Sequence, residues 1–384
     1  MRLPFSGTIG FNRNELAGSF GDIGTDLPLI VGMILACNLD PASVLIMYGI
    51  MQMMTGLAYG IPMPVQPLKA MAVIMISQKL SGNLLYGAGL SIGIVMLFLS
   101  ITGLLQWLAR IIPKSVVRGI QLGLGLSLTT LALKNYVPSD GTLGYVLAGI
   151  SFFLIVLLRR NKRFPPALFV IFLGILYAIS LKLDWMKLQD GIGFALPHIH
   201  TPDLKNMLSG FLILALPQIP LSISNSIVAT NQTVKDLFPE QPIGIKKIGV
   251  TYSCMNLISP FFSGIPTCHG AGGLAGHYTF GARTGGSVIM YGMIYLIIGF
   301  FFSRGFDEVI KVFPLPVLGI ILFFEGLALM SFIKDVIETE SDLFICLLVA
   351  AISFCLPQGY IIGLLTGTLI VYINRAIKLG EGRF

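Results

Sequence analysis

The stretch Pro62-Met63-Pro64-Val65-Gln66-Pro67-Leu68-Lys69 decides the fold, because it opens an apolar segment, Pro64–Gln78, that is unusually short. A membrane helix needs about 20 mostly apolar residues, so this segment cannot form a complete span. The prolines keep the lead-in extended, and Pro67 suits the first position of a helix, where its missing N–H costs nothing. We therefore predict an extended lead-in and a half-helix, with Gln66 at the N-cap and Lys69 in the first turn.

A second stretch of the same kind follows 204 residues later in the chain. Gly60-Ile61-Pro62 introduces the first short segment, and Gly264-Ile265-Pro266 introduces another, Cys268–Phe280. Residues 113–128 and 314–329 also align with each other, at an offset of 201. The chain therefore contains a weak internal repeat, and each half carries one short segment.

Composition places these segments in a membrane. Of the 384 residues, 55% are hydrophobic and 11% are charged, and the mean hydropathy is +0.85, whereas soluble domains carry about 25% charged residues. Too few charges remain to cover a water-exposed surface. The sequence predicts an all-α polytopic membrane protein with about fourteen transmembrane segments, at Glu15–Cys37, Pro41–Gly60, Pro64–Gln78, Leu84–Leu108, Arg118–Leu133, Leu143–Leu158, Pro166–Leu181, Leu208–Thr230, Ile248–Phe262, Cys268–Phe280, Gly285–Phe302, Pro314–Phe332, Leu343–Leu356 and Gly359–Ile373.

An odd number of segments in each half turns the second half upside down in the membrane. This 7+7 inverted repeat is the architecture of secondary transporters. We predict a first repeat at residues 1–190 and a second at 191–384, with the polar link at 182–205 on the outer side and half-helices as segments 3 and 10. Broken segments at matching places in two inverted repeats predict a substrate site where they meet.

The net charge of +7 reflects topology. With the N-terminus inside, 17 Lys and Arg residues fall at the inner ends of segments and 7 at the outer ends. The positive-inside rule then predicts a multi-pass protein of the cell (inner) membrane with cytoplasmic N- and C-termini. The cluster Arg159-Arg160-Asn161-Lys162-Arg163 is the strongest anchor. No nucleic-acid motif accompanies these cations, so we expect no nucleic-acid partner.

Two half-helix N-termini that face each other would form an anion site, because they present unpaired N–H groups and positive dipole ends. In the second stretch, glycines allow a ligand to approach the backbone, and a threonine and a histidine add side-chain donors. The alternative is tight helix packing by small residues, which fits Cys268 best. The candidate substrate-binding residues here are Thr267, Cys268, His269, Gly270, Gly272 and Gly273.

Two polar stripes lie on the segments expected beside these half-helices. In the first segment, residues at i, i+4, i+7 and i+11 share one helix face; these are Glu15, Ser19, Asp22 and Asp26. The eighth segment carries Gln218, Ser222, Asn225 and Ser226. Such stripes line a substrate path or form hydrogen bonds between helices. On the first interpretation Thr25, Gln218, Ser222 and Asn225 join the substrate site.

Two charged residues inside apolar segments need partners. A lysine within the membrane is costly when unpaired, so Lys69 contacts either the substrate anion or a permanent partner, Asp22, Asp26 or Glu325. Glu325 lies inside the apolar run 318–329, and burial favours the neutral form of a carboxyl. Glu325 and Asp22 are therefore candidate proton carriers, and the alternative for Glu325 is a structural pair with Arg118 or with a backbone donor.

Enzyme chemistry has no support in this sequence. The five cysteines, Cys37, Cys254, Cys268, Cys346 and Cys355, are scattered and fit neither a disulfide framework nor a zinc site. The sequence carries no catalytic triad and no nucleotide-binding loop. We expect no catalytic residue, no metal and no cofactor.

Three motifs resemble the molybdate transporter family, which is related to the SulP sulfate permeases. They are Asn14–Thr25, Pro62–Lys69, and Cys268–Tyr278 with Phe280–Arg283. The resemblance implies a substrate, molybdate, bound between segments 1, 3, 8 and 10. It also implies a core domain, residues 14–110 plus 206–303, and a gate domain, residues 111–183 plus 306–376.

Two features depart from the SulP pattern. The sequence ends about eleven residues after the last apolar segment, so we expect no STAS domain. Many SulP proteins have an arginine where Gly273 stands here, and Lys69 would then supply the cationic partner. The alternatives to a molybdate carrier are a sulfate transporter and an anion channel of the same fold. The sequence leaves open the coupling ion, for which protons are one option, and the oligomeric state, for which a homodimer is one option.

Overall fold

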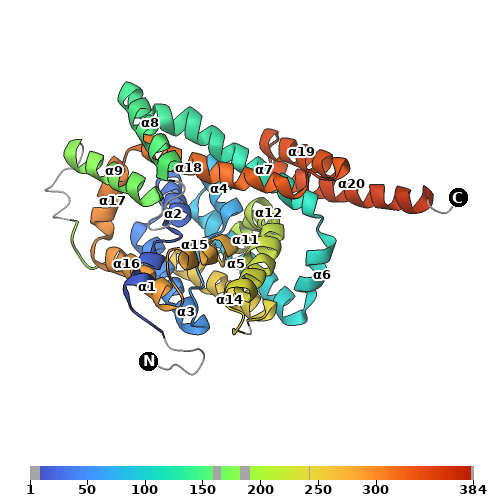
Figure 1. Cartoon of the computed structure of the whole chain (residues 1–384), viewed down its shortest axis with the longest axis horizontal. Coiled ribbons are helices and arrows are strands. Elements are labelled where there is room, and N and C mark those ends of the chain that lie inside the picture. Colours follow the sequence, from blue (N-terminus) through green and yellow to red (C-terminus); the bar gives the residue numbers. More distant parts are fainter. Residues whose placement is uncertain (1–8, 159–165, 182–190, 242, 382–384) are drawn as a thin grey trace.

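The computed structural model describes residues 9–158, 166–181, 191–241 and 243–381, and this part of the chain is mostly helical (Figure 1). The basic cluster at 159–163 and residues 182–190 of the expected outer link lie outside the described residues. The first half contains α1 (Arg13–Ser19), α2 (Ile23–Cys37), α3 (Pro41–Tyr59), β1 (Gln66–Pro67), α4 (Lys69–Gln78), α5 (Gly82–Thr102), α6 (Leu104–Ile111), α7 (Lys114–Leu131), η1 (Ala132–Tyr136), η2 (Val137–Asp140), α8 (Gly141–Leu158) and α9 (Pro166–Leu181).

The second half of the chain is also mainly helical. Its elements are α11 (Leu204–Gly210), η3 (Phe211–Ala215), α12 (Leu216–Leu221), η4 (Ser222–Ala229), α13 (Thr230–Leu237), α14 (Ile245–Ile258), η5 (Ser259–Phe262), β2 (Thr267–Cys268), α15 (Ala271–Thr279), α16 (Gly286–Phe301), α17 (Ser303–Val312), α18 (Leu315–Met330), η6 (Ser331–Asp335), α19 (Glu340–Cys355) and α20 (Gly359–Glu381). Among the described residues, five helices are long and apolar enough to cross a membrane, and up to seven if each sharply bent pair counts as one span.

Local chemistry sets the ends of these helices. Asp40 caps α3 by accepting a hydrogen bond from Ser43 N–H, and Pro41 occupies the first helical position. The helix ends at Gly60, which has a φ of 68° that glycine adopts without strain. The lead-in to β1 starts directly afterwards, so the αL glycine marks the point where the helix gives way to extended chain.

The expected first segment is two helices. A bend of 43° separates α1 from α2 at residues 20–22. The bend brings Gly21 so close to α15 that a Cβ at this position would lie 2.5 Å from the Gly276 carbonyl carbon. The predicted single polar face is therefore divided. Glu15 accepts hydrogen bonds from the N–H groups of Arg283, Thr284 and Ser287 at the start of α16, away from the aspartates.

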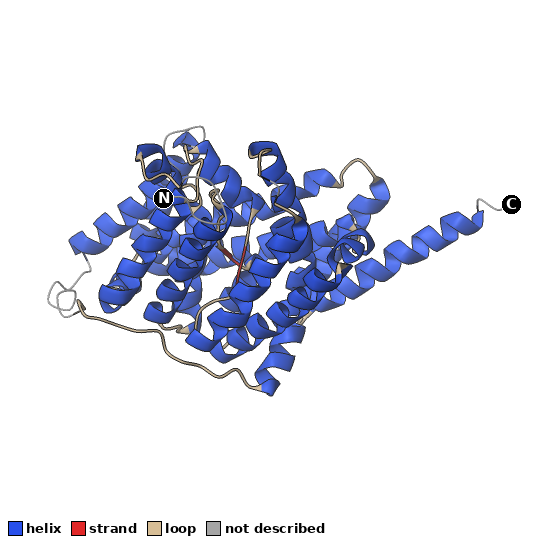
Figure 2. Ribbon diagram, turned by 90° about the horizontal axis from the view of Figure 1, so that it is seen from below, coloured by secondary structure: helices blue, strands red, loops and turns tan. Residues whose placement is uncertain are grey.

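The two extended lead-ins meet in the interior. Strands β1 and β2 pair antiparallel, with Gln66 opposite Cys268 and Pro67 opposite Thr267, and Figure 2 shows them surrounded by helices. The prediction that Gln66 caps α4 and that Pro67 starts it was wrong. Leu68 is the N-cap, and its N–H donates to Pro266 O at 3.1 Å. Pairing between the two lead-ins provides hydrogen-bond partners for backbone N–H and C=O groups that an extended segment cannot satisfy by itself.

Side-chain amides hold both lead-ins in the same way. Gln52 Nε2 donates to Val65 O at 2.8 Å, and Gln52 Oε1 accepts from Val65 N at 3.2 Å. Asn256 does the same for Thr267, at 2.6 Å and 3.0 Å. Each amide comes from the helix that precedes its lead-in. The two lead-ins are therefore held by equivalent pairs of hydrogen bonds.

The helices form two packed groups. In Figure 1, α7, α8, α18, α19 and α20 run together across the top, and α3, α5, α14, α15 and α16 lie below them. Within the first group α7 packs on α18 and α19; within the second, α3 packs on α16 and α5 on α14. Contacts of α4 with α7 and of α2 with α18 join the two groups. The paired lead-ins lie in the lower group, near this junction.

Candidate functional site

A cavity of about 410 Å³ lies beside the paired lead-ins. Both helix groups contribute to it: α4, α12, η4 and α15 on one side, α7, α18 and η6 on the other. Its lining residues are Gln66, Lys69, Arg118, Gln121, Gln218, Leu221, Asn225, Ser226, Ala229, Cys268, His269, Gly270, Ala271, Gly272, Leu329 and Phe332. Eight of the sequence-predicted site residues are in this set: Gln66, Lys69, Gln218, Asn225, Cys268, His269, Gly270 and Gly272.

The N-terminus of α15 opens into the cavity. Gly270 is its N-cap, and no side chain in the described residues caps it. The N–H groups of the first turn, beginning with Ala271 and Gly272, have no acceptor within a helix. A Cβ at Gly272 would have no heavy atom within 4 Å. This end of α15 is therefore a backbone donor site with room for a ligand.

The N-terminus of α4 is closed by a side chain. Gln218 Oε1 accepts from Ala70 N–H at 2.8 Å and lies 3.4 Å from Met71 N. Gln218 Nε2 donates to Ser222 Oγ at 3.1 Å, and Ser222 Oγ lies 2.8 Å from Tyr252 OH. These contacts match the alternative interpretation of the eighth-segment stripe, hydrogen bonding between helices. The starts of the two short helices are thus unequal: Gln218 caps α4, whereas the N-cap of α15 makes no side-chain hydrogen bond.

Lys69 pairs with Glu325 across the junction of the two helix groups. Lys69 Nζ lies 2.7 Å from Glu325 Oε1, and their side chains are 33% and 9% exposed. Of the partners considered for Lys69, the structure selects Glu325, and it does not pair Glu325 with Arg118. The pair keeps a buried carboxylate compensated. Lys69 also lines the cavity.

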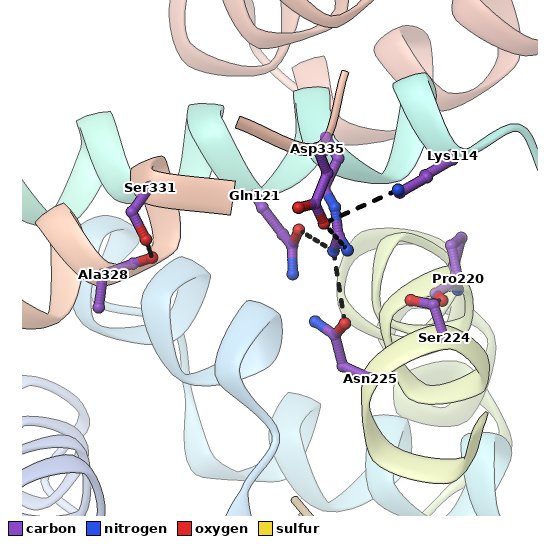
Figure 3. A network of polar contacts seen from close by, with 9 residues as sticks. Lys114, Gln121, Pro220, Ser224, Asn225, Ala328, Ser331 and Asp335 are labelled. Carbon is purple, nitrogen blue, oxygen red and sulfur yellow. Dashed lines mark hydrogen bonds and ion pairs between the residues drawn. The ribbon is translucent and has the colours of Figure 1, made fainter. Parts of the chain in front are cut away.

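Arg118, considered from the sequence only as a topological charge or as a partner of Glu325, lines the cavity. Its guanidinium donates to Gln121 Oε1 at 2.8 Å and to Asp335 Oδ2 at 2.5 Å, and it lies 3.5 Å from Asn225 Oδ1. Figure 3 shows Gln121, Asn225 and Asp335 converging, with Lys114 at 4.0 Å from the same Asp335 oxygen. The signal in the sequence was the i, i+3 spacing of two polar residues, Arg118 and Gln121, in an apolar helix.

The side chain of His269 is used inside the protein. Its Nδ1 donates to Pro64 O at 3.0 Å, and its Nε2 accepts from Thr251 Oγ1 at 2.7 Å. A carbonyl only accepts, so the proton sits on Nδ1. We expected this ring to donate to the anion. In the structure both ring nitrogens are instead hydrogen-bonded within the protein, to Pro64 O and to Thr251 Oγ1.

Four other predicted residues lie behind the cavity wall. Thr267 is buried in β2 and held by Asn256, and Thr25 is half-buried on α2 outside the lining set. Asp22 Oδ2 accepts from Gln66 Nε2 at 2.6 Å. A Cβ at Gly273 would collide with that same Asp22 oxygen and lie 2.9 Å from Gln66 Nε2. Gly273 thus makes room for the Asp22–Gln66 contact, in contrast to Gly272.

Metal chemistry gains no support from the geometry. Within the described ranges, no group of three or more His, Cys, Asp or Glu side chains is placed to hold a metal ion. The site offers N–H donors, amides and two paired cations, which suit an anion.

Comparison with solved structures defines the class of fold. The chain matches the transmembrane domain of the cyanobacterial bicarbonate transporter BicA with a TM-score of 0.67 at 18% identity, covering 93% of this chain and 96% of that one. It matches SLC26A9 with a TM-score of 0.74 at 14% identity, covering 95% and 65%. This is a multi-pass membrane protein with the fold of these two proteins.

Sequence comparison then gives the family. The model of the family described as "Molybdate transporter of MFS superfamily" matches residues 14–128 and 210–329. Molybdate transporter 2 of Arabidopsis thaliana is 36% identical over 388 residues, covering 88% of this chain and 82% of the plant protein. The chain belongs to the molybdate transporter family, which confirms the resemblance found in its motifs. Two of those motifs, 14–25 and 62–69, lie in the first matched range, and the third, 268–283, lies in the second.

Proposed function

We propose that this protein is a secondary active transporter of a tetrahedral oxyanion, molybdate, which binds in the cavity at the N-terminus of α15. One observation carries the proposal: a helix end without a side-chain cap opens into a cavity bordered by Lys69 and Arg118. Aligned N–H groups and a positive dipole end stabilise an anion. The family membership and the transporter folds described above support the same conclusion.

The remaining lining groups suit an oxyanion. Gln66, Gln121 and Asn225 bring neutral amides to the cavity wall, and Gly272 keeps the backbone accessible. Amide and N–H donors satisfy the four oxygens without adding further charge. The site thus resembles a dipole-lined pocket more than a cationic patch. Sulfate has the same geometry and the same charge, so it is the natural competitor.

The two helix groups supply the moving parts of an alternating-access mechanism. We assign the lower group, with both lead-ins, to the core and the group of α7, α8 and α18–α20 to the gate. The Lys69–Glu325 pair joins α4 of the core to α18 of the gate. An anion that attracts Lys69 weakens this connection, which links binding to relative movement of the groups.

Charge balance predicts cation coupling. Lys69 and Arg118 are already neutralised by Glu325 and Asp335, so a dianion adds two uncompensated charges. Moving each charge inward against a negative-inside potential costs about 2.3 kcal/mol per 100 mV. Accumulation therefore needs two co-transported positive charges or an exchanged anion. Protonation of Glu325, which would free Lys69 for the substrate, meets half of this need.

Uptake into proteoliposomes tests the proposal. We expect saturable molybdate uptake, stimulated by an inward proton gradient and reduced by sulfate only at higher concentration. Uptake that sulfate inhibits as well as molybdate does would reassign the substrate. A voltage-driven conductance without saturation would show an anion channel instead of a carrier. We also expect both termini in the cytoplasm, which protease protection of tagged termini checks.

A further inference from the structure

A buried polar cluster lies beside the β1 lead-in, and none of its residues lines the cavity. Asp26, on α2, is fully buried, and its Oδ2 lies 2.5 Å from the hydroxyl oxygen of Tyr48 on α3. The same Tyr48 oxygen lies 2.5 Å from Val65 O, the carbonyl directly before Gln66. Tyr48 therefore joins Asp26 to the residue that precedes the anion site.

Counting protons decides the state of this cluster. Contacts with Val65 fix the orientation of the Gln52 amide, because Oε1 accepts from Val65 N–H and Nε2 donates to Val65 O. Gln52 Nε2 is therefore also a donor in its 3.1 Å contact with the Tyr48 hydroxyl. Tyr48 has one proton for two close acceptors, the Val65 carbonyl and Asp26. If Asp26 were ionised, one of the two 2.5 Å contacts would join two oxygens with no proton between them. If Asp26 is protonated, it donates to Tyr48, Tyr48 donates to Val65 O, and every contact is a hydrogen bond.

The surroundings of Asp26 agree with a neutral carboxyl. No donor in the described part of the chain reaches its Oδ1. An ionised carboxylate with an unsolvated oxygen at this depth would be costly. The ionisable groups around it are Asp22 at the α1–α2 bend, Tyr48 on α3, the hydrogen-bonded pair Tyr291 and Tyr295 on α16, and Lys69 and Glu325. The cation among these groups, Lys69, is itself paired with Glu325.

We propose that Asp26 carries a proton in this conformation, and that this proton holds the β1 lead-in in the position that completes the anion site. The proton is then bound together with the substrate, because loss of it redirects the Tyr48 hydroxyl from Val65 O to the Asp26 carboxylate. Val65 is adjacent to Gln66, which lines the cavity and contacts Asp22. Asp26 is thus a positioning residue that acts through Tyr48. With Glu325 it provides two protonatable carboxyls, as many as the charges of a dianion.

The protonation of Asp26 can be tested without any substrate. Infrared spectra of the purified full-length protein in nanodiscs, taken in H2O and D2O, report protonated carboxyl groups. We expect a protonated-carboxyl band that disappears in Asp26→Asn and persists in the matched variants Asp22→Asn and Glu325→Gln. A band that is unchanged in Asp26→Asn, or absent from the wild type, would overturn the proposal.

The coupling to the anion site, which rests on the proposed function, needs a second measurement. Calorimetric titration with molybdate should show affinity that falls as pH rises, by up to about tenfold per pH unit for one linked proton. Asp26→Asn keeps a donor toward Tyr48, so we expect affinity near the acid wild-type value at every pH. Tyr48→Phe should bind weakly at every pH and retain the Asp26 band.

The outcomes of this titration separate the two proposals. A Tyr48→Phe protein with wild-type affinity and pH dependence would refute the link through Tyr48. The same pH dependence in Asp26→Asn and in the wild type would refute the role of Asp26. Absence of molybdate binding in the wild type at all pH values would refute the proposed function, while the infrared result would still decide the protonation of Asp26.

Discussion

Lys69 Nζ and Glu325 Oε1 are 2.7 Å apart and join the first turn of α4 to the middle of α18, 256 residues away in the chain. The pair belongs to both helix groups, and Lys69 also lines the cavity. The Lys69 ammonium therefore both neutralises Glu325 and borders the cavity, and a single substitution of Lys69 disturbs both functions together.

Lys69→Met should lower both apo stability and molybdate binding. It leaves Glu325 buried without a partner, which we expect to cost about 2 kcal/mol, less than the 3–5 kcal/mol of a fully buried pair because Lys69 is one-third exposed. Adding Glu325→Gln should restore the apo melting temperature but not the stabilisation by molybdate. Thermal-shift assays with and without molybdate measure both effects. Full ligand stabilisation in the double variant would assign Lys69 a structural role only.

Gly272→Val should abolish molybdate binding in a protein that still folds. The new side chain enters open space at the N-terminus of α15 and blocks approach to its N–H groups. Gly149→Val is the matched control, since Gly149 also has no atom near its Cβ position but lies on α8, outside the cavity lining. If calorimetry found wild-type affinity for Gly272→Val, the anion would have to bind elsewhere.

Gly273→Ala should behave differently from its neighbour. A methyl group there collides with Asp22 Oδ2 and approaches Gln66 Nε2, so the hydrogen bond between those residues must break. We expect a lower melting temperature of the apo protein, together with weaker binding. An alanine variant as stable as the wild type would show that the α1–α2 bend can move without cost.

Arg118→Lys should weaken molybdate binding by about tenfold or more, although charge is conserved. The guanidinium reaches Gln121, Asn225 and Asp335 at once, and an ammonium lacks this planar fork. Lys114→Met is the control: its side chain is 63% exposed and lies 4.0 Å from Asp335, so little should change. Equal dissociation constants for the Arg118→Lys protein and the wild type would contradict the proposed role.

Glu325→Gln should keep molybdate binding but lose the part of the stimulation of uptake by an inward proton gradient that Glu325 carries. The amide keeps the shape of the side chain and cannot exchange a proton. Asp22→Asn should impair both binding and uptake, because Asp22 accepts from Gln66 beside the cavity. Proteoliposome uptake at matched internal pH, with acidic and neutral external buffer, measures the effect. Full stimulation in Glu325→Gln would leave Asp26 and Asp22 as the remaining carriers.

The local sequence was sufficient to predict the extended lead-ins and the short helices that follow them, because neighbouring residues determine these features. Pro62, Pro64 and Pro67 keep the first lead-in extended, and the glycines after His269 leave the start of α15 uncapped by a side chain. The motif at 268–283 and its counterpart at 62–69 were specific enough to indicate the family. Chain chemistry and hydropathy thus determined that two short helices follow extended lead-ins and that they lie in a membrane, since both depend on residues within one or two turns.

The tertiary structure alone decided which polar groups meet. Lys69 had three carboxylates as possible partners in sequence, and the packing of α18 against α2 and α7 brought Glu325 to it. Gln218 became the cap of α4, Arg118 entered the cavity wall, and the ring of His269 turned inward to Pro64 and Thr251. The physical reason is range. Helix ends follow from local backbone constraints, whereas a buried polar group takes the partner that the packing of distant helices places within about 3 Å, and no local pattern records that distance.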